Sequence, residues 1–310
     1  MGHINAIGLK KIYNNISEED IEEIKKCNIC IRAKATNKIY KTSTNKTNYD
    51  YLEKIASDIC GPFKDKTYNK YQYFLTFLDK KTRYLEVKLL RNKDETYNAF
   101  LEFKARNENN KDNKRIRIYQ TDLGTEFINK RFNSLFNKEG IIHQTGPAYT
   151  KEPNGFFERI NRTLLNIVRS LLITSNLPKY LWGEALEAAV YIYNRTPHSG
   201  INFISPYEAK MAIKPDLGNI KIWGSTVYYK IKDINLSKLD PRAQRGILVG
   251  YGTDSHNYKI YNLIKRIAAW YRDITILEGQ FYKPDNYDII NNNNIDISVK
   301  NTPNTITRSK

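Results

Sequence analysis

Apolar residues between positions 50 and 145 occur in short runs with the spacing of strands, and longer segments with helical spacing separate the later runs. The strand-like runs are rich in β-branched and aromatic residues and end at glycine, proline or charged turns, which are the usual signals of strands. They predict strands at 52–60, 71–78, 84–90, 115–119 and 141–144. The segments with helical spacing predict helices at 93–108 and 127–139.

The segment that begins after Asn154 predicts a long amphipathic helix. At about 100° per residue, Arg162 and Arg169 fall about 40° and about 20° from Glu158, so the three charges share one side. The opposite side carries Ile160, Leu164, Ile167, Val168 and Leu171. A further amphipathic helix is predicted at 177–196, with an apolar stripe suited to the core or to a dimer surface. This order of elements fits the α/β class, in the form of a ribonuclease-H-like mixed sheet with flanking helices.

The two ends of the chain have different patterns. Short β-type runs at 222–231, 246–251, 258–262 and 270–276, separated by turn residues, predict a small β-barrel. From residue 286 the sequence is polar and of low complexity, so we expect disorder there. Residues 1–48 predict two short helices followed by a Cys pair and a basic linker.

Composition and charge point to a polyanionic partner. The chain has 310 residues, enough for two modules, with 50 Lys and Arg against 33 Asp and Glu, a formal net charge of +17. This excess, with aromatic residues at 12%, makes nucleic acid the leading partner. The alternative is a compositional bias, because Lys, Asn, Ile and Tyr are all abundant.

Cysteine usage and hydropathy indicate the cellular compartment of the protein. The three cysteines are an odd number without a disulfide pattern, which favours a reducing compartment. No signal peptide is recognisable, and no apolar run approaches the length of about 18 residues that suggests a membrane span. We therefore expect no membrane association.

Three acidic residues form the candidate catalytic set. Asp58 and Asp122 stand at the ends of predicted strands, and Glu158 stands near the start of the long helix, with 35 residues between the last two (123–157). Acids on two strands and a helix can converge on Mg²⁺, which prefers carboxylate oxygen, and two such ions can assist phosphoryl transfer. Each acid alone is equally well explained as an exposed strand-end, turn or helix-surface residue. Their joint spacing favours the functional interpretation.

The sequence around these acids resembles the integrases of copia-type LTR retrotransposons. The resemblance is carried by SDICGPF around Asp58, TDLGTEF around Asp122 and PNGFFERINRTL around Glu158, and it extends to about residue 285. It implies that the three acids bind Mg²⁺ or Mn²⁺ in the active site of a ribonuclease-H-like core. It also implies an SH3-like C-terminal module. Leu123 departs from the family pattern, which has Asn after the second Asp.

The N-terminal segment resembles the zinc-binding region that precedes this core. Cys27 and Cys30 match the Cys pair, and His3 matches the second of the family's two His residues. The first His would precede Met1, which points to a truncated start. A structural zinc site normally has four ligands, so the alternative is a pair of partly buried thiols beside a surface His.

DNA contacts and domain limits complete the sequence predictions. Candidate DNA-binding residues are Tyr149, Lys151, Asn154, Arg159, Arg162 and Arg169, on the loop and the helix around Glu158. The predicted domains are an incomplete zinc-finger-like segment (1–48), the catalytic core (49–212), the SH3-like module (215–285) and a disordered tail (286–310).

The resemblance implies an integrase that processes cDNA 3′ ends and joins them to target DNA as a homo-oligomer. We expect it in the nucleus and also in cytoplasmic particles. The alternatives are a catalytically inert transposon-derived protein that binds nucleic acid and a related ribonuclease-H-fold nuclease or transposase.

Overall fold

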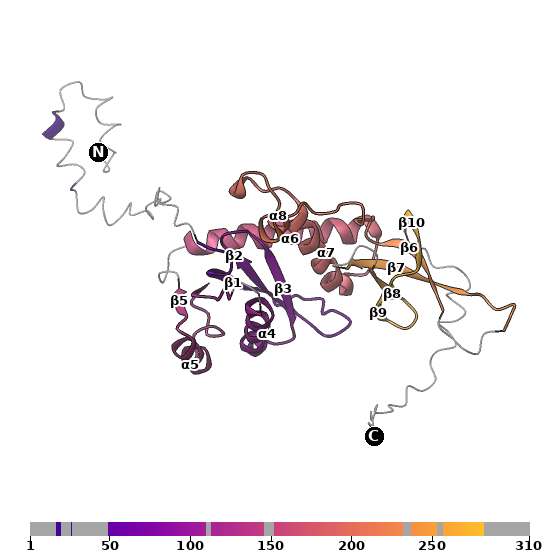
Figure 1. Ribbon diagram of the computed structural model, residues 1–310, viewed down its shortest axis with the longest axis horizontal. Coiled ribbons are helices and arrows are strands. Elements are labelled where there is room, and N and C mark those ends of the chain that lie inside the picture. The colour runs from indigo at the N-terminus through magenta and orange to yellow at the C-terminus, as the bar shows by residue number, and fades with distance from the viewer. Residues whose placement is uncertain are drawn as a thin grey trace, which may run out of the picture. The chain divides into compact units, whose positions relative to one another are not determined.

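A computed structural model describes residues 17–19, 26, 49–109, 113–145, 152–231, 237–252 and 257–281, with 152–156 as backbone. The chain divides into two units, residues 1–47 and 48–310, and the account below concerns the second. Its elements are shown in Figure 1. Among the described residues, none of the helices combines the length and the apolar character needed to cross a membrane.

The first sheet has five strands in the order β3-β2-β1-β4-β5. Strands β1, β2 and β3 are antiparallel neighbours, whereas β4 and β5 run parallel to β1. The strands are β1 (Lys54–Cys60), β2 (Tyr73–Asp79), β3 (Leu85–Leu90), β4 (Ile118–Thr121) and β5 (Ile142–Thr145). A mixed sheet with this order and helices on both faces confirms the ribonuclease-H-like core.

Helices cover the first sheet on both faces (Figure 1). Odd-numbered β1 residues such as Ile55 pack with Phe100 and Phe132 on one face, and Phe74 and Leu85 pack under helices on the other. The first face carries α4 (Thr96–Glu108), extended by the one-turn η1 (Lys93–Glu95), and α5 (Lys130–Glu139). The second carries α6 (Glu152–Ser175) and α7 (Trp182–Arg195), which follows η2 (Lys179–Leu181). Because side chains alternate between the two faces of the sheet, the strands contribute residues to two separate apolar cores.

The second sheet is antiparallel and has the order β10-β6-β7-β8-β9. Its strands are β6 (Ser225–Lys230), β7 (Ala243–Tyr251), β8 (Tyr258–Asn262), β9 (Ile267–Tyr271) and β10 (Ile274–Phe281). The single strand predicted at 270–276 was wrong. Arg272 and Asp273 interrupt this run, and the chain on either side joins opposite edges of the sheet.

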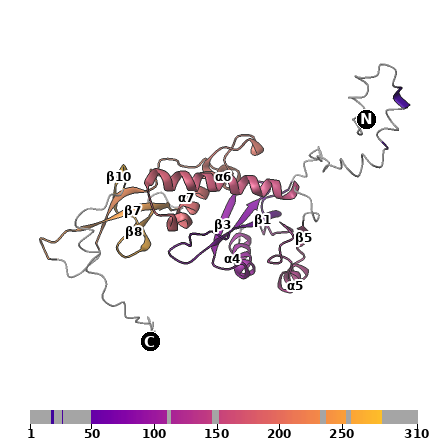
Figure 2. The same ribbon diagram turned by 180° about the vertical axis from the view of Figure 1, so that it is seen from behind.

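Helix α7 joins the two sheets through one apolar core. Its buried residues, including Leu186 and Ala189, belong to the same cluster as Leu85 of the first sheet and Leu248 of the second. Ring contacts between Tyr191 and Tyr251, with centroids 5.0 Å apart, extend this contact. Figure 2 shows α6 running along the first sheet toward β10.

The end of α6 meets the second sheet at a glycine. Gly224 immediately precedes β6 and has a φ of 86°, which lies in the left-handed region. A Cβ atom at this position would collide with the side chain of Ser175, the last residue of α6. Glycine is therefore required here both by its backbone conformation and by the close approach of the helix.

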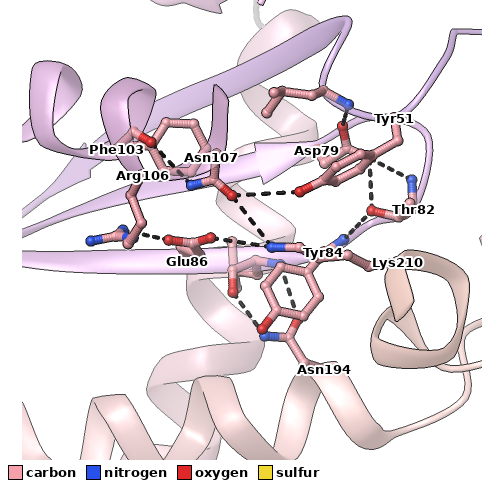
Figure 3. Close-up of polar contacts among 12 residues, drawn as sticks. Tyr51, Asp79, Thr82, Tyr84, Glu86, Phe103, Arg106, Asn107, Asn194 and Lys210 are labelled. Carbon is pink, nitrogen blue, oxygen red and sulfur yellow. Dashed lines mark hydrogen bonds and ion pairs between the residues drawn. The ribbon is translucent and has the colours of Figure 1, made fainter. Parts of the chain in front are cut away.

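A polar cluster fastens α8 (Pro206–Met211), which follows η3 (Ser199–Ile201), to the first sheet (Figure 3). The ammonium of Lys210 lies 3.5 Å from the Glu86 carboxylate and 4.0 Å from the centroid of the Tyr84 ring. Nearby, the buried Asp79 carboxylate accepts hydrogen bonds from the backbone of Leu52 and from Thr82. These contacts satisfy charges that would otherwise be costly to bury.

Asn194 covers part of the exposed edge of β3 (Figure 3). Its amide nitrogen donates to the Leu85 carbonyl at 2.8 Å, and its amide oxygen accepts from the Leu85 N–H at 2.9 Å. Asn194 of α7 thus occupies the N–H and C=O groups of Leu85, with which a further strand would pair.

Leu186→Ala tests whether the two sheets form one cooperative unit. Leu186 is fully buried, so the substitution should lower the free energy of unfolding by about 2–5 kcal/mol. Urea unfolding followed by tryptophan fluorescence measures this change, because Trp182 and Trp223 both belong to the shared core. Ile173→Ala on α6, where the side chain is 72% exposed, should change stability by less than about 0.5 kcal/mol. Two separate unfolding transitions would contradict a shared core.

Candidate active site

The parallel pairing of β1 and β4 places Asp58 and Asp122 at the same edge of the sheet. Ala56 pairs with Gln120 at the end of this ladder, so each aspartate follows its paired residue by two positions. Because side chains alternate along a strand, both carboxylates project from the face that α6 covers. Asp122 lies just beyond β4, and its carboxylate accepts a hydrogen bond from the Gly124 N–H at 3.0 Å, which fixes the turn.

Asp122 affects the ionisation of the Asp58 carboxyl. Burial, followed by repulsion from Asp122, raises the pKa of the Asp58 carboxyl from an ordinary 3.8 to about 6. Glu126 adds a smaller repulsion in the same direction. A cation between such carboxylates would relieve this repulsion, and paired acids of this kind are typical of functional sites.

Asn161 is the residue of this site that the sequence analysis missed. Its amide nitrogen donates to a carboxylate oxygen of Asp58 at 2.7 Å, and its side chain is only 9% exposed. Its amide oxygen is buried without a hydrogen-bond partner in the described part of the chain. The signal in the sequence was a polar residue beside the apolar stripe of α6, next to Ile160 and three positions after Glu158.

Glu158 is exposed on the first turns of α6 and lies one turn before Asn161. Residues three apart on a helix share a side, so Glu158 projects from the side of α6 that faces Asp58. It nevertheless stays apart from the aspartate pair. Within the described ranges, no three His, Cys, Asp or Glu side chains lie close enough together to hold a metal ion.

Glu126 and Lys93 border the aspartate pair. The Lys93 ammonium lies 2.8 Å from the Glu126 carboxylate, and this hydrogen bond is the main reason that the pKa of Lys93 is raised, with a smaller effect from Asp122. Lys93 thus compensates part of the negative charge at this sheet edge. Glu126 therefore has an ion-pairing role beside the two aspartates.

The chemistry of these groups fits a hard divalent cation. Asp58 and Asp122 offer carboxylate oxygens, and the unpartnered amide oxygen of Asn161 is a further hard acceptor beside them. Mg²⁺ and Mn²⁺ prefer such ligands, and Mg²⁺ keeps several waters. The two aspartates are the residues that would hold the ion.

The other predicted site residues lie either on α6 or outside the described part of the chain. Arg159, Arg162 and Arg169 are exposed on α6, and Arg169 donates to Asn166 at 2.9 Å. Asn154 lies in the first turn of α6, where only the backbone is described. Tyr149, Lys151 and the predicted zinc ligands His3, Cys27 and Cys30 lie outside the described residues.

His143 on β5 has a structural environment. Its ring lies 5.0 Å from the Phe136 ring, measured between centroids, and its Nε2 is 2.8 Å from the Thr121 hydroxyl. Burial lowers its pKa, which favours the neutral form.

Comparison with known proteins identifies what the chain is similar to. A family model described as the retroviral polymerase SH3-like domain matches residues 225–288, which begin with β6. The retrovirus-related Pol polyprotein from transposon TNT 1-94 of Nicotiana tabacum is 29% identical over 90% of this chain. The corresponding polyprotein from transposon RE1 of Arabidopsis thaliana is 28% identical over 85% of this chain.

The chain is a homologue of retrovirus-related Pol polyproteins. The resemblance to copia-type integrases drawn from the three acidic motifs is thereby confirmed. The chain spans about a fifth of the length of these relatives, 21% and 18%.

A solved structure supports the fold. One chain of the simian T-cell lymphotropic virus intasome, determined in complex with PP2A regulatory subunit B56 gamma, aligns with a TM-score of 0.51. The alignment covers 86% of this chain and 92% of that one, at 16% sequence identity. At this identity the likeness concerns the fold alone.

Asp58→Asn tests the electrostatic cost of the aspartate pair. Because the pKa of Asp58 is raised in the folded chain, its charged form destabilises the fold above about pH 6, and this cost disappears below about pH 4. The substitution should therefore stabilise the protein at pH 8 by about 1–3 kcal/mol and have little effect at pH 4. Urea unfolding in EDTA at both pH values measures this difference. An equal effect at both pH values would show that charge is not the cause.

Proposed function

We propose that this chain is a metal-dependent polynucleotidyl transferase of the integrase type, which trims cDNA 3′ ends and joins them to target DNA. The observation that carries the proposal is the register-matched pair Asp58 and Asp122, in which Asp58 accepts a hydrogen bond from Asn161 of α6. The relatives support it through their origin in transposons.

In this proposal each acidic residue has a distinct part. Asp58 and Asp122 form the fixed half of the metal site, because Asp58 stands on β1 and Asp122 is held in the turn that directly follows β4. Glu158 completes it from α6, whose preceding segment lies outside the described residues. Two bound Mg²⁺ or Mn²⁺ ions would supply activation of the attacking oxygen and stabilisation of the leaving oxygen.

Asn161 acts as a positioning residue. Its amide nitrogen donates to one carboxylate oxygen of Asp58 and so fixes the orientation of this side chain. The same bond lowers the pKa of Asp58 and so opposes the effects of burial and of Asp122. Asn161 therefore helps to keep Asp58 ionised and correctly oriented.

The basic residues of α6 would contact the DNA backbone. Arg159 and Arg162 are exposed on the helix that carries Glu158, where they can approach phosphates beside the reacting bond. Tyr149, Lys151 and Asn154 would contribute contacts from the preceding segment. Two DNA ends require more than one active site, so we propose a homo-oligomer that acts in the nucleus.

A second candidate function is nucleic-acid binding without catalysis. The observation that favours it is the absence, within the described ranges, of a three-carboxylate cluster. Leu123 adds to it, since this exposed apolar residue takes the place of the family's Asn. A related nuclease would share the acids and lack the joining step.

Glu158→Gln separates these functions. The substitution keeps the size of the side chain and removes the anionic ligand, so strand transfer with a labelled duplex in Mg²⁺ or Mn²⁺ should fall by about 10²-fold or more. Glu102→Gln is the matched control and should keep full activity, because Glu102 of α4 forms an exposed ion pair with Lys88 of β3. Nicking without joining would indicate a nuclease. A wild type that binds DNA and gives no metal-dependent product would indicate the inert protein.

Asn161→Leu tests the positioning role. Loss of an outer partner of a metal ligand typically costs about 10–100-fold in activity or metal affinity. The substitution should also move the acidic limb of the rate–pH profile to higher pH, because the hydrogen bond that lowers the pKa of Asp58 is lost. Asn166→Leu, at an exposed position of the same helix, should leave the profile in place. A reduced rate with an unchanged profile would contradict the assignment.

A further inference from the structure

The second sheet contains a pocket that the catalytic proposal does not use. It has a volume of about 400 Å³ and is formed where residues from β6, β7, β8, β9 and the β8–β9 turn come together. This volume is within the range of small-ligand sites. The polar and aromatic residues that line it are Tyr229, Lys230, Gln244, Asn262, Lys265 and Tyr271.

A hydrogen-bonded network fixes the inner wall of this pocket. The buried Asn262 amide donates to the Tyr229 hydroxyl at 2.8 Å, and this hydroxyl lies 3.1 Å from the Gln244 amide oxygen. The Asn262 oxygen accepts from the backbone N–H of Lys265 at 2.9 Å. The wall is therefore pre-organised, so a ligand would not have to order it.

Two tyrosine rings supply an aromatic surface. The ring centroids of Tyr229 and Tyr271 are 4.3 Å apart with an interplanar angle of 39°. Tyr229 is 5% exposed, whereas Tyr271 is half-buried and forms part of the pocket wall. The inner ring thus supports the outer one, which is the arrangement that a planar ligand can stack upon.

The charge of the pocket selects among planar ligands. Lys230 and Lys265 are exposed at its border, and none of the described residues that line it is an Asp or a Glu. None of the ion pairs formed among the described residues involves either lysine. A cationic ligand such as a methylated lysine is therefore disfavoured. A planar group that carries a phosphate is favoured, because ring stacking and two ammonium groups match its two parts.

We propose that this pocket binds one unpaired nucleotide of a nucleic-acid strand, with the base against Tyr271 and the flanking phosphates near Lys230 and Lys265. Bases inside a duplex are already stacked, so the pocket would discriminate single-stranded ends from blunt ends. This inference goes beyond the proposed catalytic function, because none of the residues belongs to the acidic site.

The experiment compares two DNA probes in the absence of catalysis. The full chain carrying Glu158→Gln is titrated in EDTA with a fluorescein-labelled duplex that has an oligothymidylate overhang, and with the blunt duplex, by fluorescence anisotropy. The overhang should bind more tightly, and Tyr271→Ala should weaken its binding about tenfold while leaving blunt-end binding unchanged. Since no divalent ion is present, failure of the catalytic proposal would not affect this result.

Matched variants and a modified probe define the outcomes. Tyr271→Phe should retain binding, and Trp270→Ala should be neutral, because Trp270 is exposed on the same strand and does not line the pocket. Lys265→Gln should lower the salt dependence of overhang binding by about one counterion. An abasic overhang that binds as tightly as oligothymidylate would overturn the proposal, as would equal losses for both duplexes with Tyr271→Ala. If circular dichroism shows that Tyr271→Ala is unfolded, the abasic probe and Lys265→Gln still decide the question.

Discussion

Burial of α7 against two different sheets is the constraint on which the arrangement of the rest depends. Leu186 and Ala189 of this helix share a core with residues of both sheets. An amphipathic surface helix usually has one apolar stripe and one solvated side. In α7, acidic residues also contact other parts of the chain. The Lys259 ammonium of β8 lies 2.8 Å from the Glu187 carboxylate, and the Tyr68 hydroxyl donates to Glu184 at 2.6 Å. The SH3-like sheet is therefore an integral part of the folded unit.

The same core sets the position of α6 and thereby the geometry at Asp58. Ile160, Leu164 and Val168 of α6 belong to the cluster that contains the buried side of α7. Once these residues are packed, Asn161 is turned toward β1, where it reaches Asp58. The site consequently has a rigid half on the sheet and on this part of α6. Glu158 lies one turn closer to the start of the helix, and its side chain is exposed.

Much of the fold follows from local patterns. The short apolar runs of β1 and β2, together with the helical spacing of α6, were sufficient to predict these elements and their order, since each pattern is local. The division between β9 and β10 was missed because only Arg272 and Asp273 interrupt an otherwise continuous β-type run. That the two strands are separate is seen only from their different pairing partners in the sheet.

Only part of the candidate site could be predicted from the sequence. Asp58 and Asp122 stand at strand ends, and two adjacent parallel strands bring such positions together, so the pair follows from topology. Asn161 does not follow, because a neutral amide in an amphipathic helix has no distinctive spacing, and its role depends on the contact with another element. The exposed position of Glu158 also depends on tertiary packing, and the periodicity of a single helix carries no information about such packing.

The contact between Asn194 and Leu85 has a consequence for association between molecules. An open strand edge offers unpaired N–H and C=O groups to strands of other chains, and such edges promote aggregation. A side-chain amide has the same donor and acceptor as a peptide group, so Asn194 occupies the edge of β3 as a single residue of a neighbouring strand would. A strand from another molecule therefore cannot extend the sheet in register across Leu85.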